Sequence, residues 1–438
     1  MSFFLKGIKV PHRKNTANTP ALRMPAPKTV TLPMSMHIGA PAKLSVKIGD
    51  TVKVGTMIGK GEGAVSSDIY SGVSGKVIRI EDFTLSNGSK TMAVVIESDG
   101  EMSRDESLVP PKVNSAEELT EAIRKSGVVG LGGAGFPTHV KFKVDPSRIE
   151  ELIINGAECE PYITSDSYTM TERTEDMKYA LLKIKEHFRI KKIIVGIEEN
   201  KKKPIAAMKK LASEIEGAEV KVLPSVYPQG GEKVLIYHTT GKVVPTGKLP
   251  IDVGCIVINC TTLAAIGEYL RDGTPLTEKC VTVDGGAVKK SANVIAPIGT
   301  LISDIIEFCG GLTEDPAEVL YGGPMMGINV ADINVPILKN TNAVLALTEK
   351  ESKLPKTTAC IRCGSCTNTC PFGLAAAEIL RAYDKKDIEK LKALSVETCM
   401  ECGCCSFVCP ANRPLVQTNR LAKALLKEEK AKEGKKNG

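Results

Sequence analysis

The sequence of 438 residues contains no tryptophan, and aromatic residues make up only 4% of it. No apolar run approaches the roughly 20 residues that a membrane-spanning helix requires. The N-terminal stretch MSFFLKGIKV has one short apolar patch and no cleavage site, so it predicts no signal peptide. Aromatic residues are not interleaved with the basic ones, which argues against nucleic-acid binding. We therefore expect a globular chain without a membrane span.

Histidine is also scarce, and its distribution excludes several kinds of active site. The five histidines lie far apart in the sequence, at His12, His37, His139, His187 and His238. They form no metal-ligand cluster, and no Ser–His–Asp or Cys–His constellation is visible. The net charge of +7 is modest, and residues 421–438 carry six lysines against three glutamates. We predict that this basic tail is a solvated, frayed end. Weak attraction to an anionic membrane face or an acidic partner is the alternative.

Cysteine, in contrast, is abundant and regularly spaced. Eight of the fourteen cysteines fall in two runs, CIRCGSCTNTCP and CMECGCCSFVCP, which share the form C-x-x-C-x-x-C-x-x-x-C-P. This spacing is typical of two-cluster ferredoxins. Zinc sites or a disulfide framework are the alternatives, but zinc does not require this repeated spacing followed by proline. The pattern predicts two [4Fe-4S] clusters, one-electron chemistry and a reducing compartment.

The two runs are predicted to exchange one ligand each. Three closely spaced thiolates bind three irons of a cubane, and the fourth cysteine lies too far along its own segment to bind the last iron. The sequence therefore predicts one cluster on Cys360, Cys363, Cys366 and Cys409, and a second on Cys399, Cys402, Cys405 and Cys370. Cys404 fits no ligand position, and we expect a non-ligand thiol there.

The rest of the chain divides into segments of different character. Residues 1–28 predict an extended arm, and residues 29–100 predict a small all-β module. Alternating strands and helices within residues 112–272 predict a parallel sheet with covering helices. Residues 278–335 predict a compact β-grasp-like unit, and residues 355–420 a helical two-cluster domain. The predicted fold class is therefore multidomain α/β.

The all-β module resembles the barrel-sandwich hybrid of lipoyl and biotinyl domains. The resemblance lies in GDTVKVGTMIGK followed by IYSGVSGKV. Lipoyl and biotinyl domains carry a modified lysine at a hairpin tip, whereas the corresponding tip here, residues 62–68 (EGAVSSD), has no lysine. The resemblance thus implies the fold without the swinging arm, and we expect a structural role.

A glycine-rich loop follows the helix predicted to end near Lys125. Gly130, Gly132, Gly133 and Gly135 satisfy G-x-G-x-x-G, but the dinucleotide fingerprint requires a strand before the loop. Glycines still let backbone N–H groups approach an anion closely, and Lys141 can add a positive charge. A flexible connector is the alternative. We interpret the loop as the phosphate-binding part of a cofactor site.

Four segments in the same order resemble the NADH-oxidising subunit of respiratory complex I. They are GLGGAGFPTHVKF, NGAECEP (155–161), YPQGGEK (227–233) and INCTTL (258–263). The chain differs from complex I in its N-terminal barrel-sandwich module, and in having two ferredoxin-type clusters instead of one four-cysteine cluster. This combination, over nearly the whole chain, resembles the RnfC component of the Rnf electron-transport complex.

The resemblance implies an FMN site built from all four segments. Gly132, Gly133, Gly135 and Lys141 would hold the FMN phosphate and ring edge, and Phe136 would stack on a ring. The flavin would be lined by Asn155, Glu158, Glu160, Tyr227, Gly230, Gly231 and Asn259. Glu232 falls where complex I has an acid near NADH, and Lys233 stands in place of a second glutamate. For Glu158 and Glu160, a pair of solvated strand-end carboxylates is the alternative.

The resemblance also implies a function. NADH would be the substrate, and FMN would accept a hydride and release electrons singly to the two clusters. The chain would sit on the cytoplasmic side of the cell membrane as a peripheral subunit. Its partners would be integral membrane and iron–sulfur subunits that couple NADH–ferredoxin exchange to Na⁺ or H⁺ movement. A soluble flavin/iron–sulfur reductase, such as a cobalamin reductase, is the rival, and a relay without flavin is a third interpretation.

Overall fold

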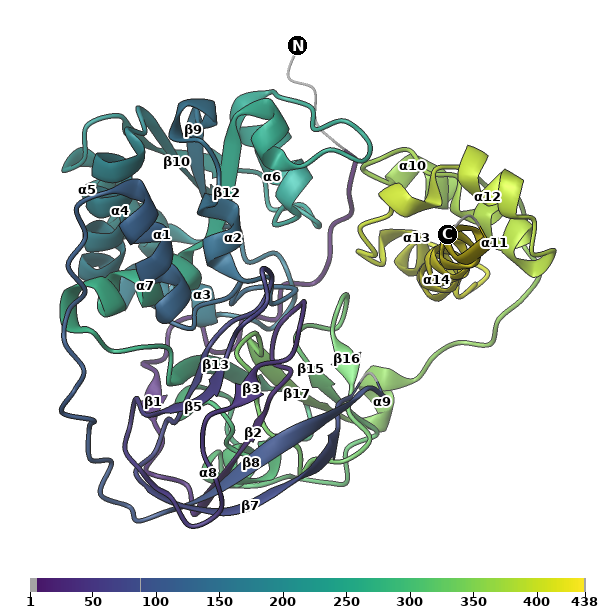
Figure 1. Ribbon diagram of the computed structural model, residues 1–438. Helices are drawn as coiled ribbons and strands as arrows, with labels where there is room; N and C mark the ends of the chain where they lie inside the picture. The colour runs from purple at the N-terminus through teal and green to yellow at the C-terminus, as the bar shows by residue number, and fades with distance from the viewer. Residues whose placement is uncertain (1–5, 87, 437–438) are drawn as a thin grey trace.

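A four-stranded parallel sheet has the strand order β11-β10-β9-β12. The computed structural model describes residues 6–86 and 88–436, and Figure 1 shows this sheet at the upper left. The strands are β9 (Glu151–Gly156), β10 (Lys192–Glu198), β11 (Ala218–Leu223) and β12 (Cys255–Asn259). The apolar side chains of β9 and β10 are buried, as expected when helices cover both faces. The predicted parallel α/β sheet is confirmed.

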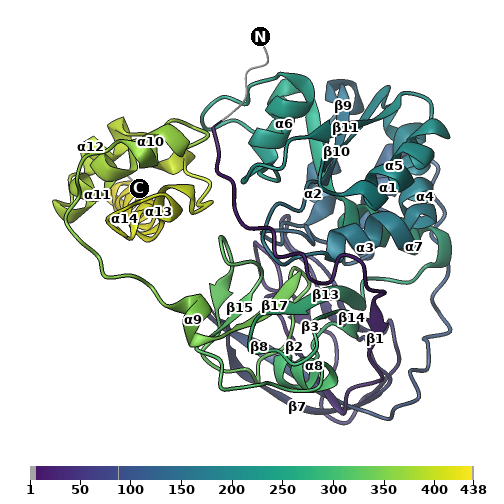
Figure 2. The same ribbon diagram turned by 180° about the vertical axis from the view of Figure 1, so that it is seen from behind.

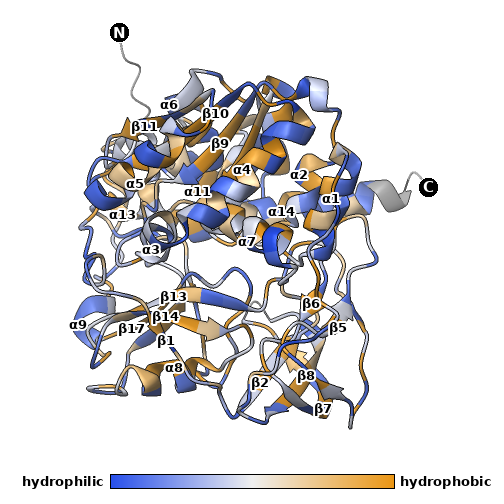
Figure 3. Cartoon of the chain, turned by 90° about the vertical axis from the view of Figure 1, so that its left-hand side faces the viewer, coloured by the Kyte–Doolittle hydropathy of each residue, from blue (hydrophilic) through white to orange (hydrophobic). Residues whose placement is uncertain are grey.

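Helices surround this sheet and complete what we call the central domain, residues 112–272. Figure 3 shows the apolar strands β9 and β10 flanked by helices that carry hydrophilic residues. Ser115 caps the first helix, where its side chain accepts a hydrogen bond from the Glu118 N–H at 3.2 Å. The helices are α1 (Ala116–Lys125), α2 (Thr138–Phe142), α3 (Ser165–Glu172), α4 (Thr174–Phe188), α5 (Lys202–Ser213), α6 (Glu232–Thr240) and α7 (Cys260–Asp272), with 3₁₀ turns at Pro146–Arg148 and Pro250–Val253.

The barrel-sandwich fold of the N-terminal module is confirmed. One sheet has the order β2-β8-β7-β4 and the other β3-β5-β6. The core of this module, which includes Val30 and Ile58, is continuous with that of the central domain. The two units therefore pack as one body. The strands are β2 (Thr29–Pro33), β3 (Lys43–Leu44), β4 (Thr51–Val52), β5 (Met57–Lys60), β6 (Ile69–Tyr70), β7 (Gly75–Thr84) and β8 (Lys90–Ser98).

The β-grasp unit contains a six-stranded sheet in the order β1-β14-β13-β17-β15-β16. Its first strand comes from the N-terminal arm and pairs in parallel with β14. The sheet continues beyond residue 335, where we predicted its end, because β17 lies between β13 and β15. The elements are β1 (Leu22–Arg23), β13 (Glu278–Asp284), β14 (Ala292–Pro297), α8 (Ile302–Phe308), β15 (Glu318–Tyr321), β16 (Ile328–Asn329), β17 (Ala343–Leu347) and α9 (Glu349–Ser352).

The cluster domain, residues 355–436, is helical and stands beside the rest of the molecule in both views (Figures 1 and 2). The basic tail is not frayed, because residues 421–436 continue the last helix. Ala422 and Leu426 in this helix are buried in the core of the domain. Residues 1–5 of the predicted arm and 437–438 of the predicted tail lie outside the described residues. The elements are α10 (Ser365–Thr369), α11 (Ala376–Asp384), α12 (Ile388–Ala393), the 3₁₀ turn Val396–Thr398, α13 (Cys404–Phe407) and α14 (Leu415–Lys436).

Within residues 6–86 and 88–436, no helix is both long enough and apolar enough to cross a membrane.

Candidate flavin and iron–sulfur sites

The glycine loop, residues 130–136, presents unused backbone donors. Gly130 N–H donates to Phe136 O at 2.8 Å and Leu131 N–H to Thr262 Oγ1 at 2.9 Å. The N–H groups of residues 132–136 donate to no other described residue. Gly132, Gly133 and Ala134 are exposed. A run of unused N–H groups on an open loop is a cradle for an anion, so the loop fits the phosphate of FMN.

The loop lies against the carboxyl edge of the central sheet, where parallel α/β sheets bind ligands. A Cβ on Gly132 would sit 2.4 Å from Asn259 Nδ2, so the close approach requires glycine. Asn259 ends β12 and is the register partner of Asn155 on β9. Asn155 Nδ2 in turn donates to Gly230 O at 2.9 Å. Residues from all four predicted segments therefore meet at this edge.

Glu158 is buried and turned toward α3. Its carboxylate accepts hydrogen bonds from Asp166 N–H at 2.7 Å and from the Ser167 hydroxyl at 2.6 Å. Asp166 itself accepts from Asn259 Nδ2 at 2.8 Å. Burial, followed by repulsion from Glu158, raises the pKa of Asp166. The alternative of a solvated carboxylate is wrong for Glu158. Its carboxylate is held by the first turn of α3, and Asp166 in the same turn contacts Asn259.

Glu160 points in another direction, toward the β-grasp unit. Its Oε2 accepts a hydrogen bond from Met325 N–H at 3.1 Å. Its Oε1 is buried and has no hydrogen-bond partner among the described residues. Burial raises the pKa of Glu160 to about 7. The solvated alternative is therefore wrong here too, and the side chain can hold or release a proton near neutral pH.

Lys141 and Glu232, predicted to bind phosphate and to lie near NADH, form an ion pair. Lys141 Nζ lies 2.7 Å from Glu232 Oε1 and also donates to Val257 O at 2.9 Å. Lys233 Nζ donates to Pro245 O at 3.4 Å. The charges of Lys141 and Glu232 are thus paired next to β12, while the Lys233 side chain contacts the loop that contains Pro245.

Two lysines, one half-buried and one buried, support the segment that carries Glu158 and Glu160, and the sequence did not reveal them. Lys14 Nζ, from the arm, donates to the carbonyls of Glu158 at 2.9 Å, Glu160 at 2.7 Å and Ile163 at 2.6 Å. Lys201 Nζ donates to Glu158 O at 3.2 Å. Burial lowers the pKa of Lys14 to about 8. A lysine in a polar arm normally predicts exposure, so no local signal marks this role.

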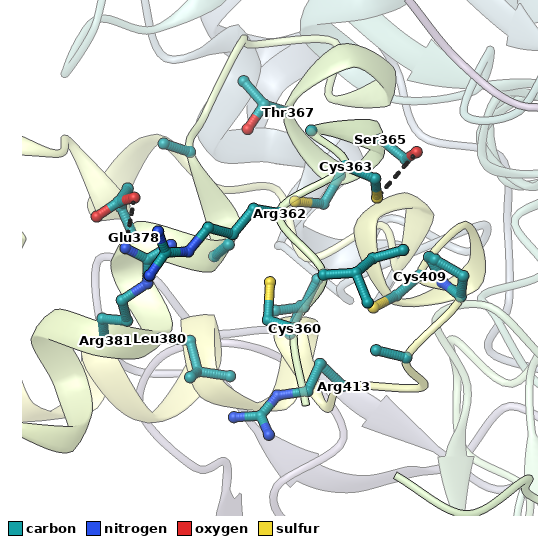
Figure 4. Close-up of a pocket in the computed structure, with 18 of the residues that line it drawn as sticks. Cys360, Arg362, Cys363, Ser365, Thr367, Glu378, Leu380, Arg381, Cys409 and Arg413 are labelled. Atoms are coloured by element: carbon teal, nitrogen blue, oxygen red, sulfur yellow. Dashed lines mark hydrogen bonds and ion pairs between the residues drawn. The ribbon is translucent and has the colours of Figure 1, made fainter. Parts of the chain in front are cut away.

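Four predicted cluster ligands line an open cavity of about 600 Å³. They are Cys360, Cys363, Cys366 and Cys409, and we call this space the open cavity. Cys360 and Cys363 are exposed. Figure 4 shows labelled cysteines around it, with Arg362 and Arg381 to one side. Arg381 pairs with Glu378 at 3.1 Å.

The other four predicted ligands line a second, more enclosed cavity, which we call the buried cavity. They are Cys370, Cys399, Cys402 and Cys405, and Cys404 lines the same space. Asn419 Nδ2 donates to Cys399 Sγ at 3.4 Å. The structure thus groups the cysteines in two sets, each with three from one run and one from the other.

The buried cavity lies on the side of the cluster domain that contacts the central domain. Tyr227 is buried, and its hydroxyl donates to Cys402 O at 2.7 Å. A Cβ on Gly231 would lie 2.3 Å from Met400 Cε. Cys159, Met325 and Met400 pack around Tyr227 and Cys402 in one apolar cluster. Two predicted flavin-lining residues therefore touch the chain that forms this cavity.

The cysteine sets fit a cubane better than a single ion. Within the described part of the chain, no three His, Cys, Asp or Glu side chains converge closely enough to hold one metal ion. Zinc would draw four sulfurs to about 2.3 Å from one point. Four cysteines spaced around a cavity instead match thiolates at the corners of a four-iron cluster.

Comparison with known families agrees with this organisation. The barrel-sandwich module matches the RnfC barrel sandwich hybrid domain over residues 2–101. The central domain matches the Nuo51 FMN-binding domain over residues 123–268. The β-grasp unit matches the SLBB domain over 280–329, and the cluster domain matches the 4Fe-4S dicluster domain over 356–413.

Individual relatives cover most of the chain. The C subunit of the proton-translocating ferredoxin:NAD(+) oxidoreductase complex of Clostridium ljungdahlii is 42% identical over 86% of this chain and 83% of its own. The C subunit of the Na(+)-translocating complex of Acetobacterium woodii is 40% identical over 96% of each chain. The C subunit of the ion-translocating oxidoreductase complex of Rhodobacter capsulatus is 39% identical over 98% of this chain and 85% of its own.

A solved structure shares the fold. The NAD+-reducing [NiFe]-hydrogenase in its H2-reduced state aligns with a TM-score of 0.52 at 18% identity. The alignment covers 71% of this chain, and the chain spans 63% of that hydrogenase chain.

Together, the fold and the sites define an oxidoreductase subunit whose cofactors are FMN and [4Fe-4S] clusters. The chain belongs to the RnfC family, the C subunits of Rnf-type, ion-translocating ferredoxin:NAD(+) oxidoreductase complexes.

Proposed function

We propose that this chain is the reversible, NADH-oxidising electron-entry subunit of a membrane-bound Rnf-type complex. The names of the relatives from Clostridium ljungdahlii, Acetobacterium woodii and Rhodobacter capsulatus support this assignment. The observation that carries it is the direct contact between the flavin segments and the buried cavity, through Tyr227 and Cys402. A site for a two-electron donor thus adjoins a site for one-electron carriers.

FMN, when bound, supplies the ability to take a hydride and to give up electrons one at a time. In our proposal the N–H groups of residues 132–136 hold its phosphate. Asn155 and Asn259 fix the carboxyl edge of the sheet on which it rests. Glu160 holds or releases a proton, because its carboxyl is buried and titrates near neutral pH. Lys141 neutralises Glu232 until a ligand phosphate competes for its ammonium group.

We propose an order for the two cluster sites from the layout of the cluster domain. The buried cavity adjoins the central domain, and the open cavity has exposed cysteines. We assign Cys370, Cys399, Cys402 and Cys405 to the electron-entry side, and Cys360, Cys363, Cys366 and Cys409 to the exit side. A later carrier can approach the open cavity, because Cys360 and Cys363 have no protein covering them within the described chain.

The partners follow from the names of the relatives. We infer that the chain assembles peripherally, on the cytoplasmic side of the cell membrane, with integral membrane and iron–sulfur subunits. It would exchange electrons with ferredoxin only through them. Relatives at 42% and 40% identity are named for H⁺ and Na⁺ translocation respectively, so their shared sequence does not determine the ion.

Anaerobic purification tests the enzymatic assignment. We expect about eight irons, a matching count of sulfide and one FMN per chain, with bleaching of the flavin and the clusters on addition of NADH. A chain that takes up no FMN after anaerobic reconstitution would refute the proposal. Co-sedimentation with membranes from cells that express the neighbouring subunits, and release when those subunits are deleted, tests the location.

A further inference from the structure

The glycine loop is held from behind by two other parts of the chain. Ile38 N–H, in the barrel-sandwich module, donates to Gly135 O at 3.0 Å. Asn340 Nδ2, just before β17, donates to Gly133 O at 3.0 Å. Lys279, the second residue of β13, donates through its Nζ to Leu131 O. Alternate carbonyls of the loop therefore each receive a donor from outside the central domain.

This arrangement decides where the loop N–H groups point. In a planar trans peptide the carbonyl and the N–H of one unit point in opposite directions. Fixing the carbonyls of Leu131, Gly133 and Gly135 therefore turns the N–H groups of Gly132, Ala134 and Phe136 away from the three donors. These N–H groups belong to the set that donates to no other described residue.

The hairpin tip of the barrel-sandwich module supports one of these donors. Ala40 N–H donates to Val65 O at 3.0 Å, and a Cβ on Gly39 would lie 2.0 Å from that same oxygen. Ser67 in the tip donates to Gly127 O at 3.0 Å, just before the glycine loop. The buried Lys339 Nζ links Ser67 Oγ at 3.1 Å to Gly127 O at 2.8 Å. Figure 3 shows β5 and β6, on either side of the tip, beneath α1 and α2.

We propose that Ile38, Lys279 and Asn340 are positioning residues that preorganise the glycine loop for the flavin phosphate. The barrel-sandwich tip, which carries a lysine in lipoyl domains, here holds the loop in place through Ile38. The central domain alone supplies the N–H groups, but the barrel-sandwich module and the β-grasp unit set their direction. This inference rests on the proposed function, because it takes the loop as the site of the FMN phosphate.

The test compares FMN with riboflavin, which has the same ring and ribityl chain but no phosphate. Both affinities are measured anaerobically by fluorescence quenching on the full-length, cluster-containing chain after removal of its flavin. Asn340→Ala removes one donor from the loop. We expect its preference for FMN over riboflavin to fall about fivefold, the value of one hydrogen bond, with riboflavin affinity unchanged. Asn334→Ala in the same unit, whose side-chain amide donates to Asp332 Oδ1 at 3.0 Å, is the control.

A second pair of variants tests the backbone donor. Ile38→Pro removes the N–H, while Ile38→Ala keeps the N–H and removes the same side chain. Only the proline variant should lose preference for FMN.

Equal losses of FMN and riboflavin affinity, or no loss in Asn340→Ala and Ile38→Pro, would overturn the positioning role. A wild-type chain that binds riboflavin as tightly as FMN would overturn it together with the phosphate assignment. A chain that binds neither flavin would instead refute the proposed function itself.

Discussion

The two cysteine-lined cavities differ in exposure although their sequence motifs are nearly the same. Cys402 and Cys405 of the buried cavity are 8% and 9% exposed, whereas Cys360 and Cys363 of the open cavity lie at the surface. The buried cavity contacts Tyr227, and the open cavity contacts solvent. The spacing of the cysteines predicts the two ligand sets. Only the tertiary packing shows which set lies next to the central domain and which faces solvent. In the proposed function, this difference makes the buried cavity the entrance for electrons and the open cavity the exit.

The largest effect should come from loss of a ligand in the buried cavity. Cys402→Ser is expected to lower the iron content from about eight to about four per chain. Cys404→Ser changes the neighbouring thiol, which we assigned as a non-ligand, and should leave about eight irons. Iron and sulfide analysis after anaerobic reconstitution measures both. Equal iron loss in the two variants would show that Cys404 is also a ligand.

A chelator should distinguish the two cavities in the wild-type chain. Since exposure controls access to a cluster, we expect iron release in two phases, with the open cavity emptied several times faster. Cys363→Ser should leave only the slow phase and Cys402→Ser only the fast one. Absorbance of an iron chelate follows the release. A single phase in the wild-type chain would contradict the difference in exposure.

A titratable carboxylate, Glu160, lies near the buried cavity. It accepts a hydrogen bond from the N–H of Met325, which packs in the same apolar cluster as Cys402. Burial raises its pKa from 4.5 to about 7, so the folded chain binds this proton more tightly than the unfolded chain. The tighter proton binding adds to the free energy of unfolding. This stabilisation is fully present below pH 4.5 and is lost as the pH rises through about 7. It amounts to at most about 3 kcal/mol.

Glu160→Gln should remove this part of the pH dependence. Chemical unfolding at pH values from about 5 to about 8 measures it as a difference from the wild type. Glu219→Gln, on the exposed side of β11, should leave the dependence unchanged. Parallel wild-type and Glu160→Gln curves would show that Glu160 does not titrate in this range.

A smaller effect is expected at the contact between the two domains. Tyr227→Phe removes the hydroxyl that donates to Cys402 O and leaves that carbonyl unpaired. We expect a loss of about 1 kcal/mol in the free energy of unfolding and slower electron delivery to the clusters. Tyr179→Phe, on α4, is the control. Unchanged stability and unchanged cluster reduction would show that the contact is not needed for coupling.

Much of this architecture could be predicted because its signals are local. The cysteine spacing and the glycine loop each depend on residues close together in sequence. The alternation of strands and helices likewise predicted the parallel sheet, and hence the meeting of segments at its carboxyl edge.

The support of the site could not be predicted, because it depends on contacts between distant residues. Lys14 lies in a polar arm but binds three carbonyls of the segment 158–163. Lys279 and Lys339 are likewise buried only because β13 and the segment before β17 bring them behind the loop. The orientation of the Glu158 side chain depends on where α3 packs, because its carboxylate is bonded to Asp166 and Ser167 at the start of that helix. The expectation of a frayed tail was wrong because two apolar positions among its many lysines, Ala422 and Leu426, are buried.

The order of the two cavities is tested most directly by mixing the two single-ligand variants rapidly with NADH under anaerobic conditions. Flavin and cluster absorbance are followed together, with electron paramagnetic resonance to count the reduced clusters. In Cys363→Ser the cluster of the buried cavity should be reduced as fast as in the wild type. In Cys402→Ser the flavin should bleach while the remaining cluster stays oxidised. Rapid reduction of the open-cavity cluster in Cys402→Ser would contradict the account, because electrons would then bypass the buried cavity.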